Sequence, residues 1–270
     1  MSPSMPEATI AEQAAPAAHE AGIHVAIAAE KVGSFLGLTI TNTLITSWVV
    51  AILLIVVAFI LRSKLKMIPG RFQTLIEEMV AYVYDYIAEV LESREMARKF
   101  FPLLMTIFLF VFTSNVLEFL PGVGSFGFFL PGEFVPLFRS VNTDLNTPLI
   151  LAIISFFVIE VTGILAIGIA KYSRKFIVNP IRDPIGAMVG VVELIGELVR
   201  VVSLSFRLFG NVLAGEVVLA VALYFAPYLL PVPLMMFELF IGTLQAAVFA
   251  LLTLFFIKLA IQEPHGEAAH

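Results

Sequence analysis

Residues 32–61 contain no charged side chain, and three basic residues, Arg62, Lys64 and Lys66, follow almost at once. A helix that crosses the hydrocarbon core of a bilayer needs about 20 consecutive, mostly apolar residues. Residues 43–61 meet that requirement and predict a transmembrane helix. The rest of the chain agrees, because only 14% of its residues are charged, whereas a soluble domain carries about 25%. An integral membrane protein is therefore predicted.

Four further apolar segments are long enough to cross a membrane. With the first, the predicted spans are about 43–61, 100–117, 149–170, 185–226 and 234–262. Residues 72–93 differ, because apolar and acidic side chains alternate there with helical spacing. That pattern predicts an amphipathic helix on the membrane surface or against a partner. Residues 118–146, rich in Pro, Gly and Phe, are predicted to be a loop. The predicted fold class is all-α, with polytopic transmembrane helices.

The spans form one predicted membrane domain, residues 31–263, between a mobile N-terminal tail (1–30) and a short C-terminal tail (264–270). The N-terminal tail has several Pro and Ala but no Lys or Arg. It therefore resembles neither a secretory signal peptide nor an Arg-rich organellar leader. We expect the protein to lie in a bacterial inner membrane.

Lys and Arg collect in the loops on the cytoplasmic side of a membrane protein. An alternating topology places eleven of the 16 basic residues on one side: Arg62, Lys64, Lys66, Arg71, Arg94, Arg98, Lys99, Lys171, Arg174, Lys175 and Arg182. Only Lys31 and Arg139 fall on the other side. The C-terminus and the basic loops are therefore predicted to be cytoplasmic, with the N-terminus and the 118–146 loop outside.

The last two spans are too long for an upright crossing. Residues 185–226 lack proline, and 42 helical residues would extend for about 63 Å, twice the roughly 30 Å of the hydrocarbon core. A strongly tilted C-terminal helical hairpin is predicted. The alternative is that residues 185–198 form a separate interfacial helix.

Ionisable side chains inside membrane spans are costly and usually mark an ion path. In the fourth span, Glu193, Glu197, Arg200, Arg207 and Asn211 fall on one polar stripe at 100° per residue, and Glu216 falls opposite. Glu216 is therefore not expected to pair with Arg207. The last span contains Glu238 and, seven residues later, Gln245, and a hairpin would bring Glu216 and Glu238 to the same end.

Three small residues, Gly196, Ser203 and Gly210, recur every seven positions beside Arg207. Small residues let another helix approach closely, so a partner helix beside a fixed charge is one interpretation, and ordinary packing within the chain is the other. Arg207 has no carboxylate on its own face within one helical turn. We therefore expect its counter-ion on another protein.

The chain contains no Cys, and its four His residues lie near the termini, at 19, 24, 265 and 270. Disulfides, thiol catalysis and Cys-ligated metals are excluded. We expect no catalytic, metal, nucleotide or cofactor site, and no nucleic-acid partner.

Five segments in order carry a family resemblance: ITNTLITSW from residue 40, FTSNVLEFLPG from 112, TDLNTPLILAI from 143, SLSFRLFGNVLAGE from 203 and IGTLQAAVFALLTLFFI from 241. Together they resemble subunit a of F-type ATP synthases over roughly residues 38–262. The resemblance implies a proton-translocating stator subunit that is not an enzyme on its own. It would supply two aqueous half-channels to a rotating c-ring and belong to a large hetero-oligomer in a lipid membrane, with peripheral-stalk b-type subunits.

The resemblance also implies roles for single residues. Arg207 would face the proton-carrying carboxylate of the ring and prevent a proton short-circuit, and Gln245 would hydrogen-bond Arg207. The outer half-channel would be lined by Asn211, Glu216 and Glu238, with Asn115, Asp144 and Asn146 at its mouth. Glu193 would belong to the inner half-channel, with Glu197 and Arg200 nearby.

Two features depart from the family pattern. The family often has one carboxylate at the positions of Glu216 and Glu238, whereas this chain has two, and close carboxylates share a proton. We therefore expect a coupled relay. Glu118, expected to line the half-channel, stands where the family often has an apolar residue or Asp.

Two rival functions use the same charges differently. A proton-coupled transporter needs its own substrate site and usually internal repeats, and no convincing repeat is present. A passive membrane scaffold leaves the charges inside the spans unexplained. Replacing Arg207 by Ala separates these functions from the stator.

Overall fold

The computed structural model describes residues 31–35, 38–119, 127–130, 133–136, 139–176, 184–227 and 229–262. The tails predicted at 1–30 and 264–270 lie outside the described residues. The described chain is almost entirely helical, and five of its helices are long and apolar enough to cross a membrane. The all-α, polytopic membrane fold is therefore confirmed.

The helices are α2 Asn42–Lys64, α3 Arg71–Leu91, α4 Arg94–Glu118, α5 Asn146–Ile167, α6 Ile169–Phe176, α7 Pro184–Phe225 and α8 Pro231–Ile261. The five that can span a membrane are α2, α4, α5, α7 and α8, and α3 is the amphipathic helix. Two small antiparallel hairpins, which the sequence did not predict, precede α2 and follow α4: β1 Lys31–Phe35 with β2 Leu38–Thr41, and β3 Gly127–Leu130 with β4 Glu133–Pro136. A short 3-10 turn, η2 Val141–Thr143, leads into α5.

Two helix boundaries differ from the prediction for identifiable reasons. The third span was expected to continue to residue 170, but α5 ends at Ile167 because Gly168 adopts a φ of 88°, a conformation that glycine tolerates. The last span was expected to begin at 234, but α8 already begins at Pro231. Proline is tolerated there because the first turn of a helix has no acceptor for its N–H groups.

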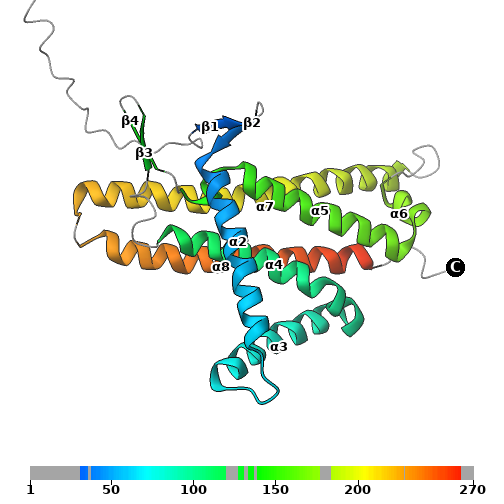
Figure 1. Cartoon of the computed structure of the whole chain (residues 1–270). Coiled ribbons are helices and arrows are strands. Elements are labelled where there is room, and N and C mark those ends of the chain that lie inside the picture. Colours follow the sequence, from blue (N-terminus) through cyan, green and yellow to red (C-terminus); the bar gives the residue numbers. More distant parts are fainter. Residues whose placement is uncertain are drawn as a thin grey trace, which may run out of the picture.

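The fourth span is one continuous helix. α7 runs for 42 residues, so the alternative of a separate interfacial helix at 185–198 is wrong. α7 and α8 lie side by side along most of their length, and α2 crosses them in Figure 1. The 23 residues of α2 extend for about 35 Å, enough to cross upright. A 42-residue helix confined to a core of about 30 Å must lean about 60° from the membrane normal.

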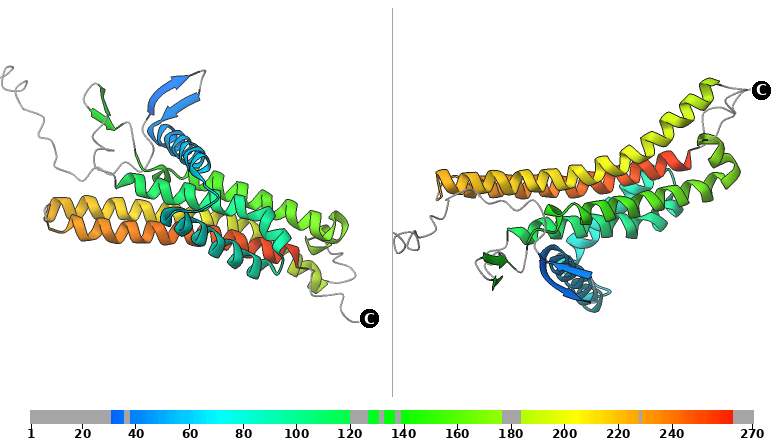
Figure 2. Two further views of the ribbon diagram at one scale, coloured as in Figure 1. Left: turned by 60° about the horizontal axis from the view of Figure 1, so that its bottom comes forward. Right: turned by 90° about the horizontal axis from the view of Figure 1, so that it is seen from above.

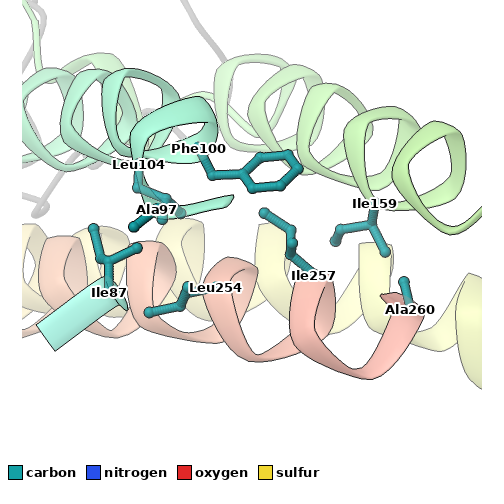
Figure 3. Packing of buried hydrophobic residues seen from close by; sticks show 8 residues of the cluster. All are labelled: Ile87, Ala97, Phe100, Leu104, Ile159, Leu254, Ile257 and Ala260. Carbon is teal, nitrogen blue, oxygen red and sulfur yellow. The ribbon is translucent and has the colours of Figure 1, made fainter. Parts of the chain in front are cut away.

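The core lies where α3, α4, α5 and α8 meet. One cluster of buried side chains, Ile87, Ala97, Phe100, Leu104, Ile159, Leu254, Ile257 and Ala260, joins these four helices (Figure 3). A second cluster, around Phe249 of α8 and Leu208 of α7, joins α4, α5, α7 and α8. α7 packs on both α5 and α8, so these two helices together fix its position.

The corner between α3 and α4 is tied to the C-terminal end of α8. Glu92 ends α3 with a left-handed φ of 54°, and its carboxylate accepts a hydrogen bond of 2.8 Å from the Lys258 ammonium. This bond lowers the pKa of the Glu92 carboxyl below its ordinary value. Ser93 then caps α4 by accepting a hydrogen bond from the Met96 N–H.

Candidate functional site

Arg207 lies on an exposed face of α7. Its guanidinium donates one long hydrogen bond, 3.4 Å, to the Ser203 hydroxyl one turn earlier. Within the part of the chain that the structure describes, no carboxylate pairs with Arg207. A Cβ added to Gly196 or Gly210 would meet no other atom within 4 Å. The Arg207 face, defined as Gly196, Ser203, Arg207 and Gly210, is therefore uncovered by the described chain, and α7 runs along one edge of the molecule in Figure 2.

Gln245 has a different partner from the one expected. Its Oε1 accepts a hydrogen bond of 2.8 Å from the Nδ2 of Asn211, one helical turn beyond Arg207. Its Nε2 is buried and has no hydrogen-bond partner among the described residues. In this structure Gln245 thus bonds Asn211, and Arg207 bonds Ser203, so the expected bond between Gln245 and Arg207 stays a prediction.

A small cavity joins several of the predicted residues. It is lined by Asn115, Glu118, Phe119, Asn211, Val212, Glu238, Ile241, Gly242 and Gln245, from α4, α7 and α8. The space open to the centre of a water molecule is about 10 Å³, which is roughly what one water needs. The helices thus bring five predicted residues, Asn115, Glu118, Asn211, Glu238 and Gln245, around one water-sized space.

Glu238 lies directly against the backbone of α7. Both of its carboxylate oxygens are buried and have no hydrogen-bond partner in the described chain. A Cβ added to Gly215 would collide with this carboxylate. A side chain at 215 would therefore displace the Glu238 carboxylate from its place against α7.

Glu216 is paired with a residue that sequence reasoning did not select. The guanidinium of Arg139 donates to the Glu216 Oε2 at 3.1 Å, and the side chains are 8% and 32% exposed. The backbone N–H of Arg139 also donates a hydrogen bond of 3.2 Å to the hydroxyl oxygen of Thr46 on α2. The charges of Glu118, Glu216, Glu238 and Arg139 lie near enough to interact. The sequence signal for Arg139 was that it is one of two basic residues on the predicted outer side.

Two buried hydrogen bonds hold the side chain of Asn115 in place. Its Nδ2 donates to the Gly242 carbonyl at 2.9 Å, and its Oδ1 accepts from the Asn142 Nδ2 at 2.7 Å. Asp144 does not line the cavity. It accepts from the Thr43 hydroxyl at 3.0 Å and from the Asn146 side chain at 2.8 Å, which links the start of α5 to the start of α2.

The predicted inner residues form a second group on α7. The carboxylate of Glu197, which is 5% exposed, pairs with the Arg200 guanidinium at 2.5 Å. The guanidinium also lies 4.0 Å from the centre of the Phe256 ring on α8. Glu193 is half-buried, one turn before Glu197. Arg200 is thus neutralised within the chain, in contrast to Arg207.

Comparison with known proteins gives a consistent result. A family model described as "ATP synthase A chain" matches residues 44–258. The chain is 31% identical over 219 residues to "ATP synthase subunit a" of Moorella thermoacetica, covering 81% of this chain and 89% of that protein. It is 37% identical over 226 residues to the protein of the same name from Gloeobacter violaceus, covering 82% and 84%. It is 35% identical over 219 residues to "ATP synthase subunit a 1" of Pelobacter propionicus, covering 81% and 87%.

Proposed function

Because this chain belongs to the ATP synthase A chain family, the proton-translocating membrane subunit of the rotary ATP synthase, we propose that it forms two aqueous half-channels beside a rotating c-ring. Protons would reach the ring through the outer half-channel and leave through the inner one. Arg207 would separate the two paths. The chain performs no covalent chemistry itself and works as part of a multi-subunit complex.

The observation that carries this proposal is that Arg207 is exposed and has no carboxylate partner within the described part of the chain. A membrane helix can hold a guanidinium only with compensation, and the described part of the chain supplies no carboxylate to it. The same face is open at Gly196 and Gly210, where small residues admit a close helix. A carboxylate carried past this face on a ring of partner helices would complete the charge system.

The outer half-channel is proposed to be the cavity between α4, α7 and α8. Glu238 and Glu216 would exchange protons with outside water, and Asn115, Glu118 and Asn211 would polarise the path. Gln245 would support Asn211 by the bond described above and reach Arg207 only through it. Asp144 and Asn146 would hold the mouth of the channel in place by joining α5 to α2.

Glu216 and Glu238 would form the relay in unequal roles. Glu216 is compensated by Arg139, whereas Glu238 has no hydrogen-bond partner in the described chain. Replacing each by Gln separately, with proton flow as the readout, tests the relay. Unchanged flow in both single variants would remove it.

The inner half-channel is proposed to begin at Glu193, with the Glu197–Arg200 ion pair nearby. A ring carboxylate that has turned through the lipid would lose its proton there. Arg207 would attract the deprotonated carboxylate and repel hydronium, which blocks a direct leak between the channels. Each proton crossing a potential of 100 mV releases about 2.3 kcal/mol, so several crossings must be summed for one ATP.

The remaining partners and the orientation follow from the resemblance and the charge bias. We propose that the Arg207 face contacts the c-ring and that peripheral-stalk b-type subunits bind elsewhere on the chain. The C-terminus and the basic loops would be cytoplasmic, in a bacterial inner membrane.

The proposal is tested by Arg207→Ala in the assembled synthase, with Arg98→Ala as the control, since Arg98 is also exposed but lies in the second turn of α4. ATP-driven proton pumping and ATP synthesis are measured in membrane vesicles, and assembly by co-purification in mild detergent. Arg207→Ala should abolish both activities with assembly preserved, and Arg98→Ala should keep them. Coupled synthesis by Arg207→Ala would refute the proposal.

A further inference from the structure

Glu160 is the only charged residue in α5, and it belongs to neither the Arg207 face nor the cavity between α4, α7 and α8. A charged side chain within a membrane span is costly and is retained where it serves an ion path or a polar partner. One carboxylate oxygen of Glu160 accepts a hydrogen bond of 2.8 Å from the Tyr172 hydroxyl of α6. The other oxygen is buried and has no hydrogen-bond partner among the described residues. This second oxygen is therefore a hydrogen-bond acceptor that the described chain leaves unsatisfied.

Tyr172 is built into the helix packing. Its side chain is buried, and a Cβ added to Gly163, one turn after Glu160, would meet the Tyr172 ring. Burial, and then the bond to Glu160, raise the pKa of the Tyr172 phenol well above its ordinary value. The phenol therefore stays protonated and acts as a fixed hydrogen-bond donor to the Glu160 carboxylate.

The pair lies beside the inner charged group of α7. Glu197 and Arg200 are near enough for their charges to act on the Tyr172 phenol. Arg200 is seven residues before Arg207 and so about 10 Å from it along α7, towards the end where α6 and the predicted cytoplasmic basic segment lie. Glu160, Tyr172, Glu197 and Arg200 thus bring three helices together on the inner side of Arg207.

We propose that Glu160 is a proton-exchanging residue of the inner half-channel and that Tyr172 is its positioning residue. This inference rests on the proposed function. A proton that leaves the ring carboxylate would pass through water near Glu193 and Glu197 and bind the free oxygen of Glu160. Glu160 would then release it to cytoplasmic water and return to the carboxylate.

A purely structural role makes a different prediction. If the pair only anchors α6 to α5, glutamine at 160 preserves the anchor, because its amide oxygen accepts the same hydrogen bond from Tyr172. Aspartate would be worse, because its side chain is one methylene shorter. If Glu160 exchanges protons, the order reverses, since aspartate retains the carboxylate and glutamine cannot carry a proton.

The experiment compares Glu160→Gln, Glu160→Asp and Tyr172→Phe in the complete synthase in inverted membrane vesicles. Thr162→Val is the matched control, because Thr162 is buried on the same helix and bonds only its own backbone at Val158. The readout is the initial rate of ATP-driven proton pumping per assembled complex. Glu160→Gln should lower this rate about tenfold, less than the roughly 100-fold of a positioned acid or base, because water can partly replace it. Glu160→Asp should pump faster than Glu160→Gln, and Thr162→Val should match the parent.

A rate for Glu160→Gln equal to that of the parent, or above that of Glu160→Asp, would overturn the inference. If Glu160→Gln does not assemble, Tyr172→Phe decides, because it keeps the buried ring. We expect its rate per complex to fall about threefold, the effect of one lost hydrogen bond, and an unchanged rate would overturn the inference. If Glu160→Gln pumps normally while Arg207→Ala remains inactive, the Glu160 inference fails and the proposed function stands. If Arg207→Ala synthesises ATP, the proposed function itself fails.

Discussion

Gly210→Leu separates a surface exposed to lipid from a surface that a partner helix contacts. Gly210 is exposed on α7, three residues after Arg207, and an added Cβ would meet no atom of the described chain within 4 Å. The leucine side chain therefore has room in the subunit alone. Any steric effect of this substitution must come from another protein.

The expected free energies have opposite signs in the two states. In the subunit alone, replacing glycine within a helix by leucine should stabilise the fold by about 0.5–1 kcal/mol, because glycine is a poor helix former. Against a closely packed ring helix, the extra carbons overfill the contact and should cost at least about 1–3 kcal/mol. The substitution should therefore stabilise the subunit and weaken the assembly.

Two measurements test this reversal: thermal unfolding of the purified subunit in detergent, and ATP-driven proton pumping with co-purification of the ring. Val57→Leu, on an exposed position of α2, is the control and should change neither. Gly215→Ala should show a different pattern, because its Cβ collides with Glu238 inside the chain and should lower the unfolding temperature of the subunit itself. Normal pumping by Gly210→Leu would show that no helix approaches this face, and the reasoning would then be wrong.

Three further predictions concern contacts within the chain, each measured by thermal unfolding in detergent. Gly163→Ala should destabilise the subunit by about 1–3 kcal/mol, because the new methyl group displaces the Tyr172 ring; an unchanged midpoint would contradict the packing. Arg139→Gln should destabilise the subunit by about 1–3 kcal/mol, because it leaves the Glu216 carboxylate uncompensated. Adding Glu216→Gln to this variant should recover part of the lost stability. If the losses of the two single variants simply add, the two side chains are not paired. Asn115→Ala removes two buried hydrogen bonds and should cost about 1–3 kcal/mol for the groups left unpaired, and a neutral result would show that water replaces the amide.

The helices were predictable because a chain that crosses a membrane can adopt few backbone structures. Uncharged runs of about 20 residues gave the spans, and the 42 proline-free residues gave the long, tilted helix, since backbone groups in lipid must be bonded within their own segment. The boundaries at Gly168 and Pro231 were missed because each depends on the conformation of one residue. The β1–β2 and β3–β4 hairpins lie outside the spans, where this constraint does not apply.

Side-chain partners from distant segments were not predictable by helical spacing. Arg139 and Glu216 are 77 residues apart, and their ion pair depends on how the segment from Arg139 to η2 packs against α7. In the same way, the choice of Asn211 over Arg207 as the partner of Gln245 depends on how α7 and α8 are aligned. Glu160 could have been selected from the sequence, because it is the single charge in its span. Ionisable side chains inside the fourth and fifth spans were taken as marks of an ion path, and the same reasoning applies to Glu160.

Disulfide cross-linking tests most directly whether the Arg207 face meets the ring. The chain has no native cysteine, so Gly210→Cys supplies its only thiol, and a second cysteine is placed in the ring subunit beside its proton-carrying carboxylate. A disulfide forms only when the two Cα atoms approach within about 7 Å. We expect mild oxidation to join the two subunits through Gly210→Cys and not through Phe59→Cys, an exposed position on α2. A cross-link from Phe59→Cys with none from Gly210→Cys would place the ring elsewhere and contradict the assignment of Arg207.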